Sequence, residues 1–206
     1  MVKMSHTNLV LCDQPIGLGE RKKIFLEVAT LYDFTAMTIP IEVVRGLEPG
    51  PTLFVSAAIH GDELNGIEVI RRLLEKKSLA KIKGTLIWVP VVNVHGFNAR
   101  SRYLPDRRDL NRSFPGSSRG SLAAQIAHVF MKEVVHKSTH GIDIHTGAVH
   151  RRNLPQIRAC LGDKHTRQIA EAFGVPVILN SEARDGSLRE AARKKNLPML
   201  LFEGGE

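Results

Sequence analysis

Two side chains that can bind a metal lie three residues apart, at the point where an apolar segment ends. His60 and Glu63 follow the apolar run 52–59, and the run 63–77 begins there with helical spacing. Neutral imidazole and carboxylate groups are good zinc ligands, and catalytic zinc takes three protein ligands and keeps one position open. A single H-x-x-E is weak evidence of a site. It gains weight because a third candidate ligand, His145, ends another strand-like run.

The segments on either side of His60 and Glu63 predict how these residues are positioned. The run 52–59 is apolar enough to be a fully buried strand. In the run 63–77, Ile67, Ile70 and Leu74 share one helical face. Open α/β sheets place their ligand sites at the carboxyl ends of strands. We therefore expect a metal site at this edge of a sheet.

Predicted strands and helices alternate from residue 52 to the end of the chain. Strands are predicted at 24–31, 39–45, 52–59, 85–92, 141–145, 157–161, 175–179 and 199–202, helices at 63–77, 121–137, 164–173 and 188–195, a turn cluster at 46–51 and a long loop at 93–120. This order predicts an α/β fold with a mostly parallel, mixed sheet flanked by helices. We expect residues 1–45 to form an N-terminal β-hairpin segment at one edge, and residues 46–206 to form the catalytic domain.

Three carboxylates lie where they could assist such a metal site. Asp143 precedes His145 by two residues on the same strand face, and Asp109 lies in the long loop. Either could accept the free ring N–H of a ligand histidine. Glu203 follows the apolar run 198–202, where a carboxylate is costly unless it has a task. One such task is that of general base for a metal-bound water.

The long loop is rich in arginine. Arg100 and Arg102 precede the segment 109–116, which contains Asn111 and Arg112. Arginine binds carboxylates through two parallel hydrogen bonds and can also stabilise a developing oxyanion. The alternative interpretation is a solvated basic loop.

Composition narrows the class of protein. The chain has 206 residues, of which 43% are hydrophobic, and no apolar run approaches a membrane span of about 18 residues. The N-terminus has no hydrophobic signal core and only two cysteines occur, so we expect a cytoplasmic protein with no membrane partner. The net charge of +8 could favour nucleic acid, but the basic residues are dispersed and aromatic residues make up only 5% of the chain. We therefore expect no nucleic-acid partner.

Four motifs together resemble those of a known family. The chain is similar to the succinylglutamate desuccinylase/aspartoacylase family, a branch of the zinc carboxypeptidase-like hydrolases, from about residue 40 to its last residue. The motifs occur in the family's order and are His60-Gly-Asp-Glu63-Leu-Asn-Gly66, Asp109-Leu-Asn-Arg112-Ser-Phe-Pro-Gly116, Asp143-Ile-His145-Thr-Gly147 and Phe202-Glu203-Gly204-Gly205. The resemblance implies the zinc carboxypeptidase-like fold.

The same resemblance implies roles at the metal. His60, Glu63 and His145 would bind one Zn²⁺ per chain. Glu203 would be the general base and proton shuttle, and Asp109 would orient His60.

It also implies roles toward a substrate. Arg102 would polarise the scissile carbonyl, and Asn111 and Arg112 would hold a substrate carboxylate. The segment between Arg102 and Asp109 is two residues longer than in aspartoacylase, so Arg100 is the alternative to Arg102.

Family members continue past the catalytic glutamate with the rest of the hydrolase domain and a small β-rich domain, whereas this sequence ends at Glu206. The resemblance therefore implies a truncated chain. Because the run 198–202 is apolar on both faces, we expect an interior strand whose flanking elements would follow it. We expect a chain without them either to self-associate, with a homo-oligomer as one outcome, or to precipitate.

The sequence thus predicts a zinc-dependent hydrolase that cleaves the amide of a small N-acyl amino acid or a related carboxylate-bearing amide. One alternative is a zinc carboxypeptidase acting on peptides. Another, from a different class, is an inactive binding module that retains the metal.

Overall fold

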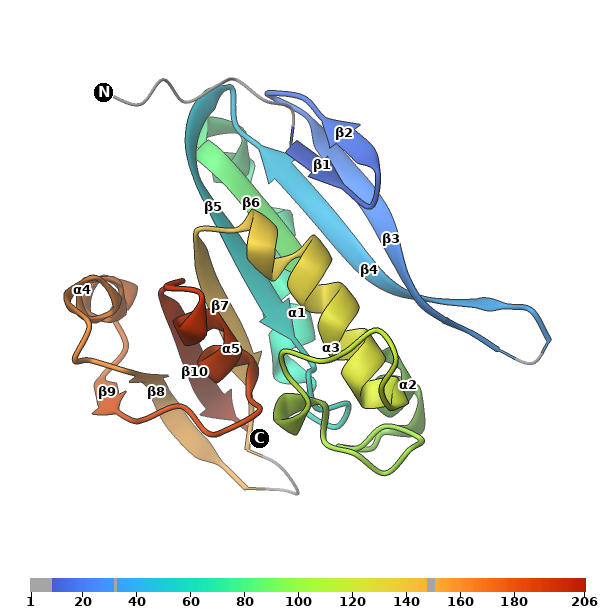
Figure 1. The fold of residues 1–206 in the computed structure, drawn as a ribbon. Helices are drawn as coiled ribbons and strands as arrows, with labels where there is room; N and C mark the ends of the chain where they lie inside the picture. Colours follow the sequence, from blue (N-terminus) through green and yellow to red (C-terminus); the bar gives the residue numbers. More distant parts are fainter. Residues whose placement is uncertain (1–8, 32, 148–150) are drawn as a thin grey trace.

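A single mixed sheet forms the centre of the molecule in the computed structural model, which describes residues 9–31, 33–147 and 151–206. Its strand order is β3-β4-β6-β5-β7-β10-β8-β9 (Figure 1), and β1 and β2 form a separate antiparallel pair. The strands are β1 (Leu9–Leu11), β2 (Gln14–Ile16), β3 (Arg21–Thr30), β4 (Ala36–Arg45), β5 (Glu48–Ala57), β6 (Lys83–Val89), β7 (His140–His145), β8 (Asn153–Ala159), β9 (Val177–Asn180) and β10 (Met199–Gly205). The neighbours β6-β5-β7-β10 run parallel, as do β8 and β9, whereas β3-β4, β4-β6 and β10-β8 are antiparallel.

Helices cover both faces of this sheet. The α-helices are α1 (Asn65–Leu74), α2 (Val94–Ala99), α3 (Leu122–Glu133), α4 (Lys164–Phe173) and α5 (Leu188–Lys194), and the short 3₁₀ helices are η1 (Lys77–Lys81), η2 (Leu110–Arg112) and η3 (Val135–Lys137). Ser121, Asp163 and Ser187 begin α3, α4 and α5, and each side chain accepts a hydrogen bond from a backbone N–H of the first helical turn. These caps fix where each helix leaves its loop.

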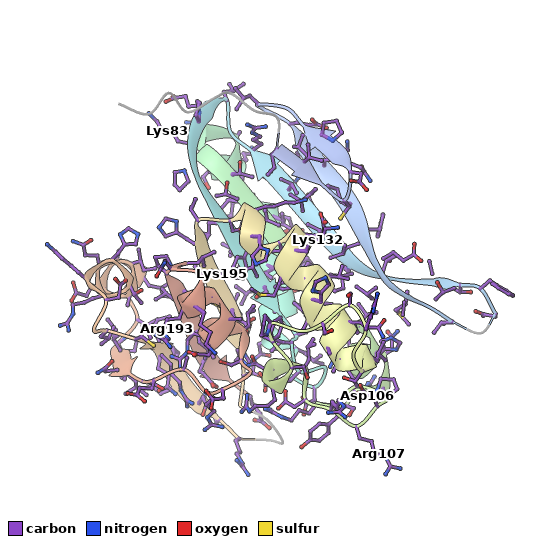
Figure 2. All side chains as sticks on the ribbon, in the orientation of Figure 1. Lys83, Asp106, Arg107, Lys132, Arg193 and Lys195 are labelled. Carbon is purple, nitrogen blue, oxygen red and sulfur yellow. The ribbon has the colours of Figure 1, made fainter. Side chains whose placement is uncertain are left out.

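The apolar core is divided by the sheet. On one face α3 and α5 pack over the strands, with Phe54 and Phe130 fully buried in edge-to-face contact. On the other face α1 packs through Ile70, and α4 packs through Ala170. The outer surface of α3 and of the end of α5 carries exposed basic side chains, among them Lys132, Arg193 and Lys195 (Figure 2). No helix in the described ranges is both long and apolar enough to cross a bilayer.

The fold predicted from the sequence is confirmed. The hairpin expected at one sheet edge is β3–β4, which extends beyond the neighbouring strands (Figure 1). Residues 199–202 of the run 198–202 lie in β10, an interior strand between β7 and β8. Of the segment expected to be the separate N-terminal part, residues 1–8 lie outside the described residues, and β3 and β4 belong to the same sheet as the remainder of the chain.

Two predictions about local structure are wrong. The cluster 46–51 is not a turn throughout, because residues from Glu48 onward belong to β5. Its glycines permit a close strand approach: a Cβ on Gly50 would lie 2.8 Å from the backbone nitrogen of Gly84. The loop 93–120 is not structureless either, since it contains α2 and η2. Asn93 and Asp109 begin these two helices by accepting backbone N–H groups.

Candidate active site

The predicted metal-binding residues lie together at the carboxyl ends of adjacent parallel strands. His60 and Glu63 are in the loop between β5 and α1, and His145 is the last residue of β7, which pairs with β5. The loop turns tightly, with the Glu63 N–H donating to the His60 carbonyl at 3.1 Å. Gly61 is required there, because a Cβ would lie 1.9 Å from the backbone carbon of Gly96. The side chains of the three predicted ligands are all buried.

One carboxylate joins the two imidazole rings. Oε1 of Glu63 is 2.7 Å from Nδ1 of His60, and Oε2 of Glu63 is 2.8 Å from Nδ1 of His145. One potential ligand atom from each residue lies within 4.8 Å of the others. Two imidazole nitrogens and a carboxylate therefore lie close enough together that they could hold one metal ion, and they are the ligand types that Zn²⁺ takes in proteins.

The far nitrogen of each ring faces a second carboxylate. Nε2 of His60 is 3.2 Å from Oδ1 of Asp109, and Nε2 of His145 is 2.8 Å from Oδ2 of Asp143. Asp143 is itself fixed by the Ser56 hydroxyl, which donates to it at 2.7 Å. Carboxylates that hold the outer N–H of an imidazole direct its other nitrogen toward a metal. The residue pattern allowed either aspartate to pair with either histidine, and the family resemblance implied Asp109 for His60. In the structure Asp109 faces His60 and Asp143 faces His145.

Electrostatics around the cluster stabilise its charged forms. Burial by itself would raise the pKa of Glu63, but hydrogen bonds from His145 and His60 hold that pKa far below its usual value. Burial opposes protonation of His145, yet the charge of Asp143 and the hydrogen bonds to both carboxylates raise its pKa. The pKa of Asp109 is lowered despite its partial burial, by His60 and by Arg102. Glu63 and Asp109 are thus held in their ionised forms near neutral pH.

Glu203 lies beside His145 on the neighbouring strand. The two residues are register partners in the parallel pair β10–β7, so their side chains leave the same face about 4.8 Å apart at the backbone. Glu203 and the cluster line one pocket with a volume of about 160 Å³. The Asn153 amide donates to Oε2 of Glu203 at 2.7 Å, and Arg158 Nη1 lies 3.7 Å from Oε1. Glu203 thus lies in the pocket wall, inside β10 and not after it, and its role as the base stays a prediction.

Arg102 reaches the cluster of His60, Glu63 and His145 from the segment between α2 and η2. Its Nε and Nη2 donate to Oδ2 of Asp109 at 3.2 and 3.0 Å, and its Nη1 lies 3.4 Å from Oε1 of Glu63. The alternative, Arg100, is exposed in a left-handed conformation at the end of α2. Arg102 lines the pocket. The geometry therefore favours Arg102 over Arg100.

Asn111 and Arg112 form another part of the pocket wall. Asn111 is buried, and its Oδ1 accepts the N–H of Leu188 at 2.9 Å, which joins η2 to the start of α5. Its amide nitrogen remains the group that can donate to a ligand. Arg112 is exposed and donates through Nη1 to the carbonyl of Asn111. Both residues are placed where a substrate carboxylate could be bound, and that role stays a prediction.

The pocket also contains residues that the sequence did not single out. These are mainly arginine and serine side chains from β8, α5 and the segment between β9 and α5: Arg158, Ser181, Arg184, Ser187 and Arg189. Arg158 had a signal, since it alternates along β8 with Ile157 and Ala159, which face the core. Arg189 is only 8% exposed and is held by the Glu182 carbonyl, a long-range contact with no local sequence signature.

Comparisons with known proteins agree with this geometry. Residues 49–206 match the model of the succinylglutamate desuccinylase/aspartoacylase catalytic domain. An N-alpha-acetyl-L-2,4-diaminobutyric acid deacetylase of Halomonas elongata is 34% identical over 150 residues, which are 70% of this chain and 44% of that protein.

Solved structures show the same architecture. A succinylglutamate desuccinylase/aspartoacylase of Rhodobacter sphaeroides superposes with a TM-score of 0.83 at 25% identity, covering 96% of this chain and 61% of that one. The product-bound ectoine utilization protein EutE (DoeB) of Ruegeria pomeroyi gives a TM-score of 0.81 at 28% identity, covering 97% and 64%. This chain thus spans under half of the deacetylase and about three fifths of these structures.

The α/β fold and the matched residues 49–206 are those of the succinylglutamate desuccinylase/aspartoacylase catalytic domain. The chain belongs to the succinylglutamate desuccinylase/aspartoacylase family, and the family predicted from the four motifs is confirmed.

Proposed function

We propose that this chain carries the active site of a zinc-dependent hydrolase that cleaves the amide bond of a small N-acyl amino acid. The observation that carries the proposal is the convergence of His60, Glu63 and His145 in a pocket whose wall also holds Glu203 and Arg102. Support comes from the family match and from the deacetylase of Halomonas elongata. We assign residues 46–206 to the catalytic domain and residues 1–45 to an N-terminal β segment.

A single Zn²⁺ ion would be held by Nδ1 of His60, the Glu63 carboxylate and Nδ1 of His145. The donor set fits, because each ring already presents Nδ1 to the shared point while an aspartate faces Nε2. Bound zinc supplies Lewis-acid chemistry: it lowers the pKa of water toward about 7 and polarises a carbonyl.

Glu203 is proposed as the residue that moves protons. It would take the proton of the attacking water and later deliver it to the leaving amine, so that one carboxylate serves both halves of the reaction. Its position favours this role, because its register partner is His145 while its own oxygens contact Asn153 and Arg158. It is thus beside the metal-binding cluster without belonging to it.

Arginine would bind the charged parts of the substrate. Arg102 would donate to the oxygen of the scissile carbonyl as negative charge develops there. Asn111 and Arg112 would hold a carboxylate, and Arg184 and Arg189 add positive charge to the same wall. The pocket wall holds more arginines than carboxylates. This balance favours an anionic substrate over a neutral one.

Pocket size favours small amides over peptides. A volume of about 160 Å³ is below the roughly 300–1,000 Å³ of pockets that enclose drug-sized ligands. The peptide-cleaving alternative is therefore the weaker one. We further propose a cytoplasmic location, supported by the free thiols of Cys12 and Cys160.

Turnover of a panel of amides tests the proposal. The full-length protein loaded with zinc should hydrolyse at least one N-acetyl, N-succinyl or N-formyl amino acid, and a chelator should abolish turnover until zinc is restored. Dipeptides with a blocked amino end and a free carboxylate, the substrates of a carboxypeptidase, serve as the comparison set. Cleavage of the dipeptides alone would favour the carboxypeptidase, and binding of zinc without any turnover would favour the inactive binding module.

A further inference from the structure

The carboxylate of Glu203 is held by an asparagine outside the four family motifs. Asn153, the first residue of β8, donates through Nδ2 to Oε2 of Glu203 at 2.7 Å. An amide donating to an ionised carboxylate makes a charge-assisted hydrogen bond, which is about twice as strong as a neutral one. Arg158 lies 3.7 Å from the other oxygen and is more exposed than Glu203, so it holds the carboxylate less tightly.

An irregularity in strand pairing places Asn153 there. In the antiparallel pair β10–β8, Glu203 is opposite Gln156, whereas Gly205 is opposite Asn153. One residue of β10 separates the two pairs, but two residues of β8 do. The extra residue makes a β-bulge in β8 immediately beside the candidate active site.

The bulge changes the face on which Asn153 lies. Side chains alternate along a strand, so one extra residue moves every side chain on the far side of the bulge to the opposite face. Without the bulge Leu154 would share the face of Glu203, but it is 63% exposed instead. The other bulged residue is Pro155, which lacks an N–H and is tolerated in a sheet at such irregular positions. The bulge therefore turns Asn153 toward Glu203.

We propose that Asn153 is a positioning residue that fixes the orientation of the Glu203 carboxylate for proton transfer. The amide occupies Oε2, so Oε1 is the oxygen that accepts the proton. This inference rests on the proposed role of Glu203 as the base. Without Asn153 the glutamate side chain can rotate away from its productive orientation, and small displacements of a catalytic group reduce rates strongly.

Substitution of Asn153 tests the proposal in the full-length, zinc-loaded protein. Asn153→Ala should lower kcat by about 10- to 100-fold, the range expected for losing one charge-assisted hydrogen bond. Its KM, zinc content and melting temperature should stay close to those of the wild type. Asn153→Asp has the same shape but places a second carboxylate against Glu203, so its kcat should fall further. The control is Asn180→Ala, which removes an asparagine hydrogen bond from the same sheet at β9.

A double-mutant cycle separates positioning from general damage. In the Glu203→Gln background, Asn153→Ala should cause almost no additional loss, because the group that it positions has already been removed. An equal fold-loss in both backgrounds would show that Asn153 acts independently of Glu203 and would overturn the proposal. A kcat within twofold of the wild type for Asn153→Ala would do the same.

A crystal structure of Asn153→Ala gives a readout without turnover. The Glu203 carboxylate should leave its wild-type position or show more than one rotamer. If it remains in place with unchanged order, the positioning role is wrong even where the enzyme is active. If the wild type cleaves none of the tested amides, the proposed function fails, and the position of Glu203 in these crystals still decides the inference.

Discussion

Replacement of Glu203 by glutamine separates a proton-transfer role from metal ligation. The substitution preserves the shape of the side chain and removes only its charge and its basicity. The amide oxygen of the glutamine can still accept the Asn153 hydrogen bond, so its NH₂ group takes the place of Oε1. The variant therefore has a hydrogen-bond donor where the reaction requires an acceptor.

The expected loss of rate follows from this exchange. A positioned proton acceptor contributes about 10²- to 10⁴-fold, which corresponds to roughly 3–5 kcal/mol of activation free energy. Stability should change much less, because the variant keeps the Asn153 hydrogen bond in its neutral form and otherwise loses an attraction to Arg158 across 3.7 Å at a partly exposed position. Such pairs contribute about 0–1 kcal/mol. Zinc content should be unchanged, since the converging ligand atoms belong to His60, Glu63 and His145.

The assay is steady-state hydrolysis of the best substrate of the amide panel, with zinc measured by elemental analysis on the same samples. Glu182→Gln is the matched control, because it removes the same charge from an exposed position next to Ser181 of the pocket wall. Its kcat should stay within about twofold of the wild type. Loss of zinc together with activity in Glu203→Gln would make Glu203 a ligand, and a kcat reduced less than tenfold would refute its role as the base.

Three further substitutions test other parts of the structure. His145→Ala should remove most of the zinc measured by elemental analysis, and full retention would contradict the assigned ligands. Arg112→Lys should weaken binding of carboxylate-bearing substrates far more than of their amide analogues in KM measurements, because lysine cannot reproduce a two-pronged hydrogen bond; equal effects would make Arg112 structural. Burial alone would raise the pKa of Glu133, but hydrogen bonds from Lys137 and from the Cys12 N–H lower that pKa in the folded protein. The ionised Glu133 therefore stabilises the folded state above the ordinary glutamate pKa of about 4.3, and this contribution is lost as the pH falls through the lowered pKa of the folded state. Glu133→Gln should therefore destabilise the protein by about 1 kcal/mol at pH 7 in urea unfolding, with a smaller difference at pH 3 and no such pH dependence if the contacts are unimportant.

Local patterns in the sequence were sufficient for the elements that carry the site. The apolar run before His60 and the run ending in His145 are β5 and β7, and their carboxyl ends meet because the two strands are parallel neighbours. Hydrophobic patterns predict such elements because the side chains that face the core of the protein are apolar. The prediction of a turn at 46–51 was wrong because the glycines there allow the chain to approach β6 closely, which is a long-range contact.

Sequence patterns could not predict the residues whose position depends on how one strand or helix packs against another. Asn153 faces Glu203 only because β8 contains a bulge. The sequence of a strand does not show where a bulge lies, because a bulge is defined by the pairing with the neighbouring strand. Arg189 reaches the pocket from the first turn of α5, where its spacing resembles that of an ordinary helix surface. Such residues become visible when the neighbouring strand or loop is in place.

The cluster of His60, Glu63 and His145 shows how local and distant contacts combine in one site. Glu63 contacts His60, three residues away, through one oxygen, and through the other it contacts His145, 82 residues away. The second oxygen also accepts the backbone N–H of Thr146 at 3.2 Å, so the end of β7 and the loop after β5 are fixed to each other. Each imidazole lies between two carboxylates. A cation bound between the two Nδ1 atoms would replace the protons that these nitrogens now share with Glu63, and the rings would not have to turn. The protein thus orients the potential ligand atoms through its own contacts, which would reduce the reorganisation needed to bind a metal ion.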